Sequence, residues 1–210
     1  MLNKETKKIF DVICKKFDEM NKLRDNAITR HREIIKISSL SIRATHREDY
    51  KEAENLIKQA QEKSEKLNAG LKNYPQIYYS GFIHDCQKEF AESCITLALI
   101  RDEKIATPAD IGVDYPAYLN GMCEAIGEVR RHIVDRMRKN DLKNSEELLL
   151  LMDEIYYMMI SIDYPDAITM GLRRTTDIAR SLIEKTRGEL TLHMRQNSLE
   201  EKMHKLEKKL

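Results

Sequence analysis

The sequence contains few residues that interrupt regular secondary structure. Its 210 residues include only 7 glycines and 4 prolines. A β-sandwich or a β-barrel needs a turn about every 8 to 12 residues, and this composition does not supply those turns. With 41% apolar residues, the chain is also too hydrophobic for a disordered protein. The composition therefore predicts an all-α protein built from long helices.

Other absences narrow the functional class. No apolar run approaches the ~20 residues of a membrane-spanning helix, and the opening MLNKETKKIF has no apolar core of a signal peptide. We therefore expect a cytoplasmic protein with no membrane partner. The four cysteines form no C-x-x-C pair, so we expect free, buried thiols rather than a zinc site. With 36 basic and 35 acidic residues, any affinity for nucleic acid must come from a local patch.

Hydrophobic periodicity and the positions of the breakers predict one all-α domain of six or seven helices. The long helices are expected over 2–46, 47–69, 76–102, 115–139, 144–161 and 165–187. Pro165 is expected in the first turn of the last of these, and Gly188 at its end. We expect the main domain to cover 1–189. A C-terminal helical extension, 190–210, carries a heptad-like apolar seam formed by Leu199, Met203, Leu206 and Leu210. Only IYYSGFI (77–83) has a local strand-like pattern.

One face of the first predicted helix carries positive charge. Seven basic residues lie between positions 22 and 47, against only Asp25 and Glu33. Helical geometry places four of them within ~60° of one another, with His46 at the border of the stripe. These four residues are Arg32, Lys36, Arg43 and Arg47. A solvated face is the simple interpretation, but solvated faces usually mix charge signs. We therefore expect this face to bind phosphate groups, with little sequence specificity.

Two pairs of glutamates form the second pattern. Glu89 and Glu92 are three residues apart on one predicted helix, and Glu124 and Glu128 are four apart on the next, so each pair shares a face. The second pair lies beside three small residues, Ala117, Gly121 and Ala125. Small residues indicate that another helix packs closely there. If the two helices pack face to face, four carboxylates converge, and such oxygen ligands suit Mg²⁺ or Mn²⁺. Ordinary surface glutamates are the alternative.

Four segments in order resemble the translin family. REIIKISSLSIRATHRED (32–49) is similar to the family's first-helix signature, and QKEFAES (87–93) resembles the Q-E-[YF]-x-E-A segment of translin-associated factor X, the catalytic branch. DYPAYLNGMCEAIGEVRRHIV (114–134) resembles the D-Y-L-x-G-x-x-[DE]-x-x-x-E-L-x-R segment. LRRTTDIARSLIEKTRG (172–188) resembles the last helix, which closes in R-G. The resemblance covers about 30–188.

This resemblance implies an all-α subunit assembled into a hollow octamer and, for the factor X branch, a Mg²⁺-dependent endoribonuclease that cuts RNA inside the barrel. By position, it assigns catalytic and metal-binding roles to Glu89, Glu92, Glu124 and Glu128. Glu124 stands where factor X has an aspartate. Because the chain carries both the basic helix and the acidic residues, it resembles a self-sufficient prokaryotic, archaeal-type member that forms a homo-oligomer.

The leading hypothesis is a Mg²⁺-dependent (or Mn²⁺-dependent) endoribonuclease acting on single-stranded RNA. In this hypothesis the basic face, including His46, holds phosphates. A non-catalytic translin-like protein that binds single-stranded RNA or DNA is the first alternative. An all-α Mg²⁺-dependent nucleotide pyrophosphohydrolase is the second. It fits less well because 31 residues separate Glu92 from Glu124 and the second pair is spaced i,i+4.

Overall fold

Long helices make up nearly all of the computed structural model, which describes residues 3–208. The six predicted long helices are all present, and no strand occurs within 3–208. They are α1 (Lys4–His46), α2 (Tyr50–Leu71), α4 (Gly81–Arg101), α6 (Tyr115–Arg138), α7 (Ser145–Ile160) and α9 (Leu172–Glu207). Three one-turn helices lie in the connections: α3 (Pro75–Tyr78), α5 (Pro108–Ile111) and α8 (Asp166–Thr169). The strand-like segment 77–83 contains the end of α3 and the start of α4, so it forms no strand.

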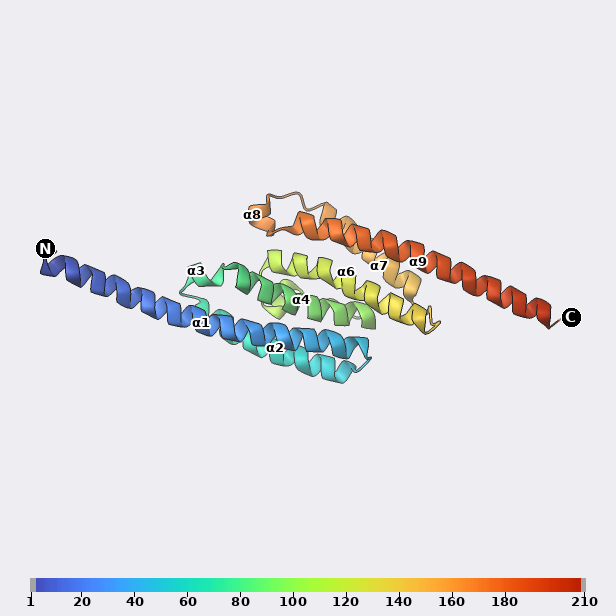
Figure 1. The fold of residues 1–210 in the computed structure, drawn as a ribbon, viewed down its shortest axis with the longest axis horizontal. Coiled ribbons are helices and arrows are strands. Elements are labelled where there is room, and N and C mark those ends of the chain that lie inside the picture. Colours follow the sequence, from blue (N-terminus) through green and yellow to red (C-terminus); the bar gives the residue numbers. More distant parts are fainter. Residues whose placement is uncertain (1–2, 209–210) are drawn as a thin grey trace.

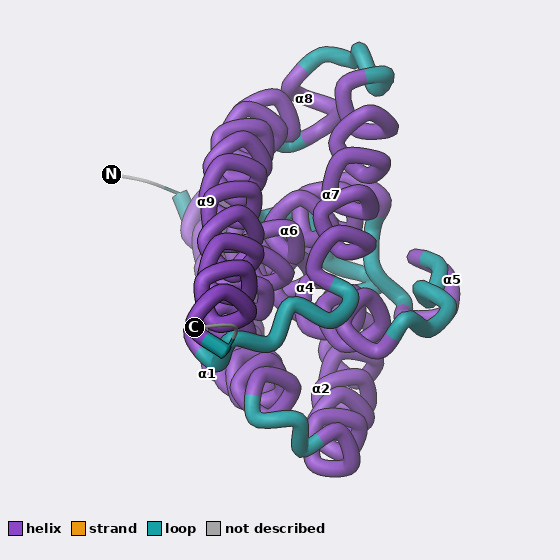
Figure 2. Tube along the Cα trace, turned by 90° about the vertical axis from the view of Figure 1, so that its right-hand side faces the viewer, coloured by secondary structure: helices purple, strands orange, loops and turns teal. Residues whose placement is uncertain are grey.

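Four of the long helices lie side by side in the order α1, α4, α6, α9 (Figures 1 and 2). The α2 helix packs against α1 and α4, and α7 packs against α6 and α9, so these two helices cover one side of the row. The α4–α6 contact is the most extensive in the molecule. Two helices from the middle of the chain therefore form the centre of the fold, and the helices near the two ends flank them.

The hydrophobic core follows the centre of this row. In α4 the uncharged run 93–100 is almost entirely buried, as its composition predicts. Phe90 of α4 and Ile126 and Ile133 of α6 have no exposed surface. The α7 and α9 helices add Met152 and Ile183 to the same cluster. Burying a side chain of this size stabilises the fold by about 1.5–3 kcal/mol, so the α4–α6 pair is held by many such contributions.

Two predicted boundaries at the last helix are wrong. Pro165 lies before the one-turn helix α8, and α9 begins only after Gly171, whose φ of +89° is a conformation that favours glycine. Gly188 does not end a helix, because α9 continues through it to Glu207. A helical glycine costs only about 1 kcal/mol relative to alanine. The buried neighbours Thr186 and Leu190 anchor the helix on both sides of it.

The first half of α1 and the last part of α9 project beyond the helical body in opposite directions (Figure 1). Both arms expose apolar side chains, including Ile9 and Phe17 on α1. The predicted seam on α9 is exposed at Leu199, Met203 and Leu206, and Leu210 lies outside the described residues. Cys14 is also exposed on the α1 arm, so the expectation of a buried thiol is wrong there, whereas Cys86 and Cys123 are buried.

No helix within residues 3–208 is both long enough and apolar enough to cross a membrane.

Candidate metal and nucleic-acid site

The site begins with the close packing of α4 on α6. Gly121 of α6 lies against the α4 backbone: a Cβ atom built on it would be 2.7 Å from the Lys88 carbonyl oxygen and 3.0 Å from the Glu92 nitrogen. The predicted small-residue face is confirmed, because Ala117 and Ala125 are fully buried on the same helix. Only glycine lets the two backbones approach this closely, and their approach brings the acidic residues of both helices together.

Three of the four predicted glutamates converge at this contact. Carboxylate oxygens of Glu89, Glu92 and Glu124 all lie within 4.8 Å of one another. Glu92 is only 8% exposed, and the other two are half-buried. Oxygens at this separation can all bind one ion, and an all-carboxylate set suits hard cations such as Mg²⁺ or Mn²⁺. The residues present therefore fit the predicted metal.

The electrostatics of the cluster also favour a bound cation. Burial, together with the negative charges of Glu89 and Glu124, raises the pKa of Glu92 from its ordinary value of 4.5 to about 8. Burial likewise raises the pKa of Glu89. Within residues 3–208, the ammonium group nearest the cluster is that of Lys88, 2.7 Å from Glu124 Oε1 and 4.0 Å from Glu89 Oε1. Burial is the largest single influence on the pKa of Lys88 and lowers it, but the hydrogen bond to Glu124 and the nearby negative charges together outweigh burial and raise this pKa. A single ammonium group therefore faces three carboxyl groups. A divalent cation would neutralise more of their negative charge.

The fourth glutamate, Glu128, has different contacts. His46 Nε2 lies 2.5 Å from Glu128 Oε2, and Arg131 Nη1 lies 3.6 Å from the same oxygen. The hydrogen bond from His46, followed by the positive charges nearby, lowers the pKa of Glu128 below its usual range. Glu128 is therefore held as an anion by its own partners, whereas Glu92 takes up a proton readily.

All four glutamates line one pocket of about 480 Å³ formed by α1, α4, α6 and α9. No residue of α2 or α7 contributes to it, so it lies on the side of the helical row that these helices leave uncovered. Arg43 from α1 and Arg131 from α6 also line the pocket. The pocket thus combines an oxygen-rich cation site with two guanidinium groups, which bind phosphate oxygens well.

The structure separates the predicted basic stripe into two parts. Arg32, Lys36 and Arg43 on α1 and Arg47 directly after it are exposed, and none of them forms an ion pair with a carboxylate in residues 3–208. Glu33, which directly follows Arg32, is instead paired with Lys63 of α2 at 2.8 Å. His46 does not share this exposure: only 6% of its side chain is accessible, and it faces Glu128.

The sequence did not predict Lys88 or Arg131 as residues of this site, and it placed His46 on the basic face rather than beside Glu128. Lys88 is four residues before Glu92 on α4, a spacing that places both side chains on one face, but its contact with Glu124 is made to another helix and no local spacing indicates it. The link between His46 and Glu128 spans 82 residues and is visible only in the folded chain. Arg131 is three residues after Glu128 on α6, a spacing that does predict contact.

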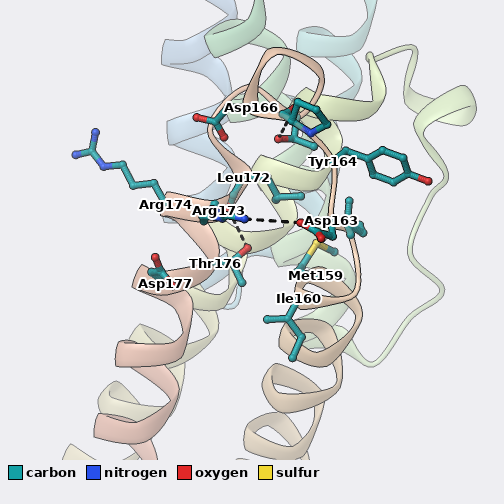
Figure 3. Close-up of a pocket in the computed structure, with 13 residues that line it drawn as sticks. Met159, Ile160, Asp163, Tyr164, Asp166, Leu172, Arg173, Arg174, Thr176 and Asp177 are labelled. Atoms are coloured by element: carbon teal, nitrogen blue, oxygen red, sulfur yellow. Dashed lines mark hydrogen bonds and ion pairs between the residues drawn. The ribbon is translucent and has the colours of Figure 1, made fainter.

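A larger pocket, of about 960 Å³, lies elsewhere, between the end of α7, α8 and the start of α9 (Figure 3). It contains none of the predicted site residues. Arg173 reaches toward Asp163 across it, 3.7 Å apart, while Arg174 points away (Figure 3). Both members of that pair are highly exposed, and exposed pairs contribute little to stability. Its mixed charges offer no convergent ligand set, so the acidic pocket is the candidate site.

The fold and the pocket define an all-helical protein with a carboxylate cluster between its two central helices. No family model matches the chain. The protein MJ0175 of Methanocaldococcus jannaschii, described as uncharacterized, is 27% identical over 187 residues, or 88% of this chain and 82% of that protein. Among solved structures, AfC3PO in complex with duplex RNA is 30% identical with a TM-score of 0.82, covering 89% of this chain and 97% of that one.

A structure of apo-NeC3PO has a TM-score of 0.79 over 92% of this chain and 98% of that one, at 22% identity, and so supports the fold. The chain belongs to the translin/C3PO family. The family resemblance found in the sequence is therefore confirmed, and so is the all-α fold class.

Proposed function

We propose that this protein is a Mg²⁺-dependent endoribonuclease that hydrolyses single-stranded RNA inside a homo-oligomeric barrel. The observation that carries the proposal is the convergence of Glu89, Glu92 and Glu124 in one pocket beside Arg43. A protein that only bound nucleic acid would have no need to bury three carboxylates together, because buried carboxylates are costly and repel phosphates. Their placement next to a cationic group is typical of phosphodiester chemistry.

Each part of the pocket has a proposed task. Glu89, Glu92 and Glu124 would hold the ion, and Mn²⁺ fits the same oxygen ligands as Mg²⁺. Mg²⁺ bound there would lower the pKa of a water molecule and offset negative charge on the phosphoryl oxygens. Arg43 binds the phosphate at the mouth of the pocket. Glu128 stays ionised at neutral pH and accepts a hydrogen bond from the attacking water, which fixes that water in line with the phosphorus–oxygen bond that breaks.

The exposed basic face of α1 holds the rest of the strand. Arg32, Lys36, Arg43 and Arg47 have no carboxylate partners within 3–208, so their charges are available to RNA phosphates. Such contacts place the strand without reading its sequence, and they would accept single-stranded DNA as well. The AfC3PO complex contains duplex RNA, which supports RNA as the ligand class. Single-stranded and duplex RNA should therefore be compared as substrates.

Assembly into a homo-oligomer, an octamer by family resemblance, would place several such pockets around one interior. The exposed apolar side chains on both arms favour assembly, because a projecting helix with an apolar stripe needs a partner. The seam at Leu199, Met203 and Leu206 is proposed as one of these subunit contacts.

The test is a substrate panel with controlled metal. Purified protein is incubated with end-labelled single-stranded RNA, the matched RNA duplex, single-stranded DNA and a nucleoside triphosphate, in Mg²⁺, in Ca²⁺ and in EDTA. We expect internal cleavage of single-stranded RNA in Mg²⁺ only, and loss of that cleavage in Glu89→Gln. Tight binding of RNA without cleavage would make the protein a translin-like binder. Triphosphate turnover with no effect on RNA would make it a nucleotide pyrophosphohydrolase.

A further inference from the structure

A buried hydrogen bond connects the end of α1 to the wall of the acidic pocket. His46 is the last residue of α1, and its Nε2 lies 2.5 Å from Oε2 of Glu128 in the middle of α6. A carboxylate can only accept here, so the proton of this bond is on Nε2. The other ring nitrogen, Nδ1, is buried with no hydrogen-bond partner in the described part of the chain. The Glu128 contact is therefore the one polar interaction that the imidazole makes there.

The geometry leaves one oxygen of Glu128 free. Both of its partners, His46 and Arg131, engage Oε2. Within residues 3–208, no side chain or backbone group forms a hydrogen bond with Oε1. Glu128 nevertheless lines the same pocket as the three-carboxylate cluster. A carboxylate anchored through one oxygen keeps a fixed orientation while it offers the other oxygen to a ligand.

We propose that His46 is a positioning residue that anchors Glu128 at the pocket wall, so that Glu128 Oε1 serves as the fourth oxygen for the metal ion or its water. The inference rests on the proposed function and assigns His46 a role different from phosphate binding. Its burial favours this role, because only 6% of the His46 side chain is exposed, whereas Arg43 and Arg47 on the same stripe are open to solvent. Hydrogen-bond partners behind ligating groups typically change metal affinity by about 10–100-fold when they are removed.

Two amide substitutions separate positioning from simple packing. In His46→Gln the side-chain amide nitrogen reaches the place of Nε2 and can donate to Glu128. In His46→Asn the amide is too short and reaches only the place of Nδ1. Both residues are polar and similar in chemistry, so they differ mainly in whether the hydrogen bond to Glu128 survives.

His132 supplies the matched control. It lies one turn after Glu128 on α6, is only 5% exposed, and its ring centroid is 6.4 Å from that of His46. In the described residues no hydrogen bond joins His132 to a glutamate. His132→Asn therefore removes a buried imidazole from the same region without touching the anchor of Glu128.

The experiment measures the Kd for Mn²⁺ by electron paramagnetic resonance, without RNA, on wild type, His46→Gln, His46→Asn and His132→Asn. Thermal unfolding and RNA binding in EDTA are measured in parallel. We expect His46→Asn to weaken Mn²⁺ binding about 10–100-fold, His46→Gln to recover most of that loss, and His132→Asn to match wild type. RNA binding in EDTA stays unchanged in all of them.

Three results would overturn the inference: equal Mn²⁺ affinity in His46→Asn and wild type, no difference between the Gln and Asn variants, or an equal loss in His132→Asn. Weaker RNA binding in EDTA for His46→Gln would indicate that His46 binds phosphate, as the sequence analysis expected, and does not position Glu128. The proposed function is judged separately, by wild-type cleavage of RNA in Mg²⁺. Cleavage by wild type together with unchanged Mn²⁺ binding in His46→Asn would contradict the positioning role alone.

Discussion

The contact between α4 and α6 can be tested by adding one methyl group to it. In Gly121→Ala the new Cβ would meet the Lys88 carbonyl oxygen at 2.7 Å and the Glu92 nitrogen at 3.0 Å. These are backbone atoms and cannot rotate away, so the two helices must move apart. The same substitution six residues later is the matched control. In Gly127→Ala the Cβ meets only the Leu182 Cδ1 atom, at an ordinary 3.6 Å.

The expected magnitudes have opposite signs. Replacing a helical glycine by alanine stabilises a helix by about 1 kcal/mol, and Gly127→Ala should gain this in full. Forcing a methyl into a filled contact costs about 1–3 kcal/mol, which exceeds the helix gain at Gly121. Taking about 2 kcal/mol for that cost, Gly121→Ala is destabilised by about 1 kcal/mol. The two variants then differ by about 2 kcal/mol, which corresponds to a Tm difference of about 4–8 °C in a protein of this size.

The assay combines thermal unfolding in EDTA with a Mn²⁺ titration. Gly121→Ala should also bind Mn²⁺ more weakly, although it changes no ligand, because it moves Glu89 and Glu92 away from Glu124. Gly127→Ala should bind Mn²⁺ as wild type does. The reasoning is refuted if Gly121→Ala is as stable as Gly127→Ala, or if its Mn²⁺ affinity is unchanged while its Tm falls.

Three further predictions concern the charges of the site. Lys88→Met removes the ammonium from Glu124, so the metal-free protein should lose about 1–3 kcal/mol. Mg²⁺ should then raise its Tm more than that of wild type in scanning fluorimetry, and an equal rise would contradict this role for Lys88. Because the pKa of Glu92 is raised from 4.5 to about 8, the folded state holds a proton that the unfolded chain has lost across that range. The free energy of unfolding in EDTA should therefore fall as pH rises through it, and Glu92→Gln should flatten this slope in urea titrations. Arg43→Gln and Arg47→Gln should each reduce the slope of log affinity against log salt by about 0.7 for single-stranded RNA, measured by anisotropy in EDTA. An unchanged slope would mean that the arginine contacts no phosphate.

The fold could be predicted well because its signals are local. Apolar periodicity and scarce breakers located all six long helices, and the uncharged run 93–100 correctly marked the core of α4. The errors came from reading Pro165 and Gly188 as boundaries. A glycine lowers helix propensity only slightly, and the packing of Leu190 was enough to carry α9 past Gly188. The sequence alone does not show whether the low helix propensity of Gly188 or the packing of Leu190 decides where α9 ends.

The site could be predicted in part. Glu89, Glu92 and Glu124 converge as their spacing and the small-residue face beside Gly121 predicted. Glu128 contacts His46 instead of the other three glutamates because α1 ends beside the middle of α6. No local sequence pattern encodes this arrangement of the two helices. His46 looked like a member of the basic stripe because its angular position borders it. At the end of α1, however, the side chain is turned toward α6, and only the tertiary structure shows this.

The central claim is that the carboxylate cluster binds the metal that RNA cleavage requires. Its most direct test measures binding and cleavage of one labelled single-stranded RNA in the same reactions, for wild type, Glu124→Gln and Glu201→Gln, in Mg²⁺ and in EDTA. Glu201 is exposed on the α9 arm and serves as the matched control. The account predicts Mg²⁺-dependent cleavage by wild type and Glu201→Gln, and full binding with no cleavage by Glu124→Gln. Cleavage that persists in Glu124→Gln, or in EDTA, would contradict it.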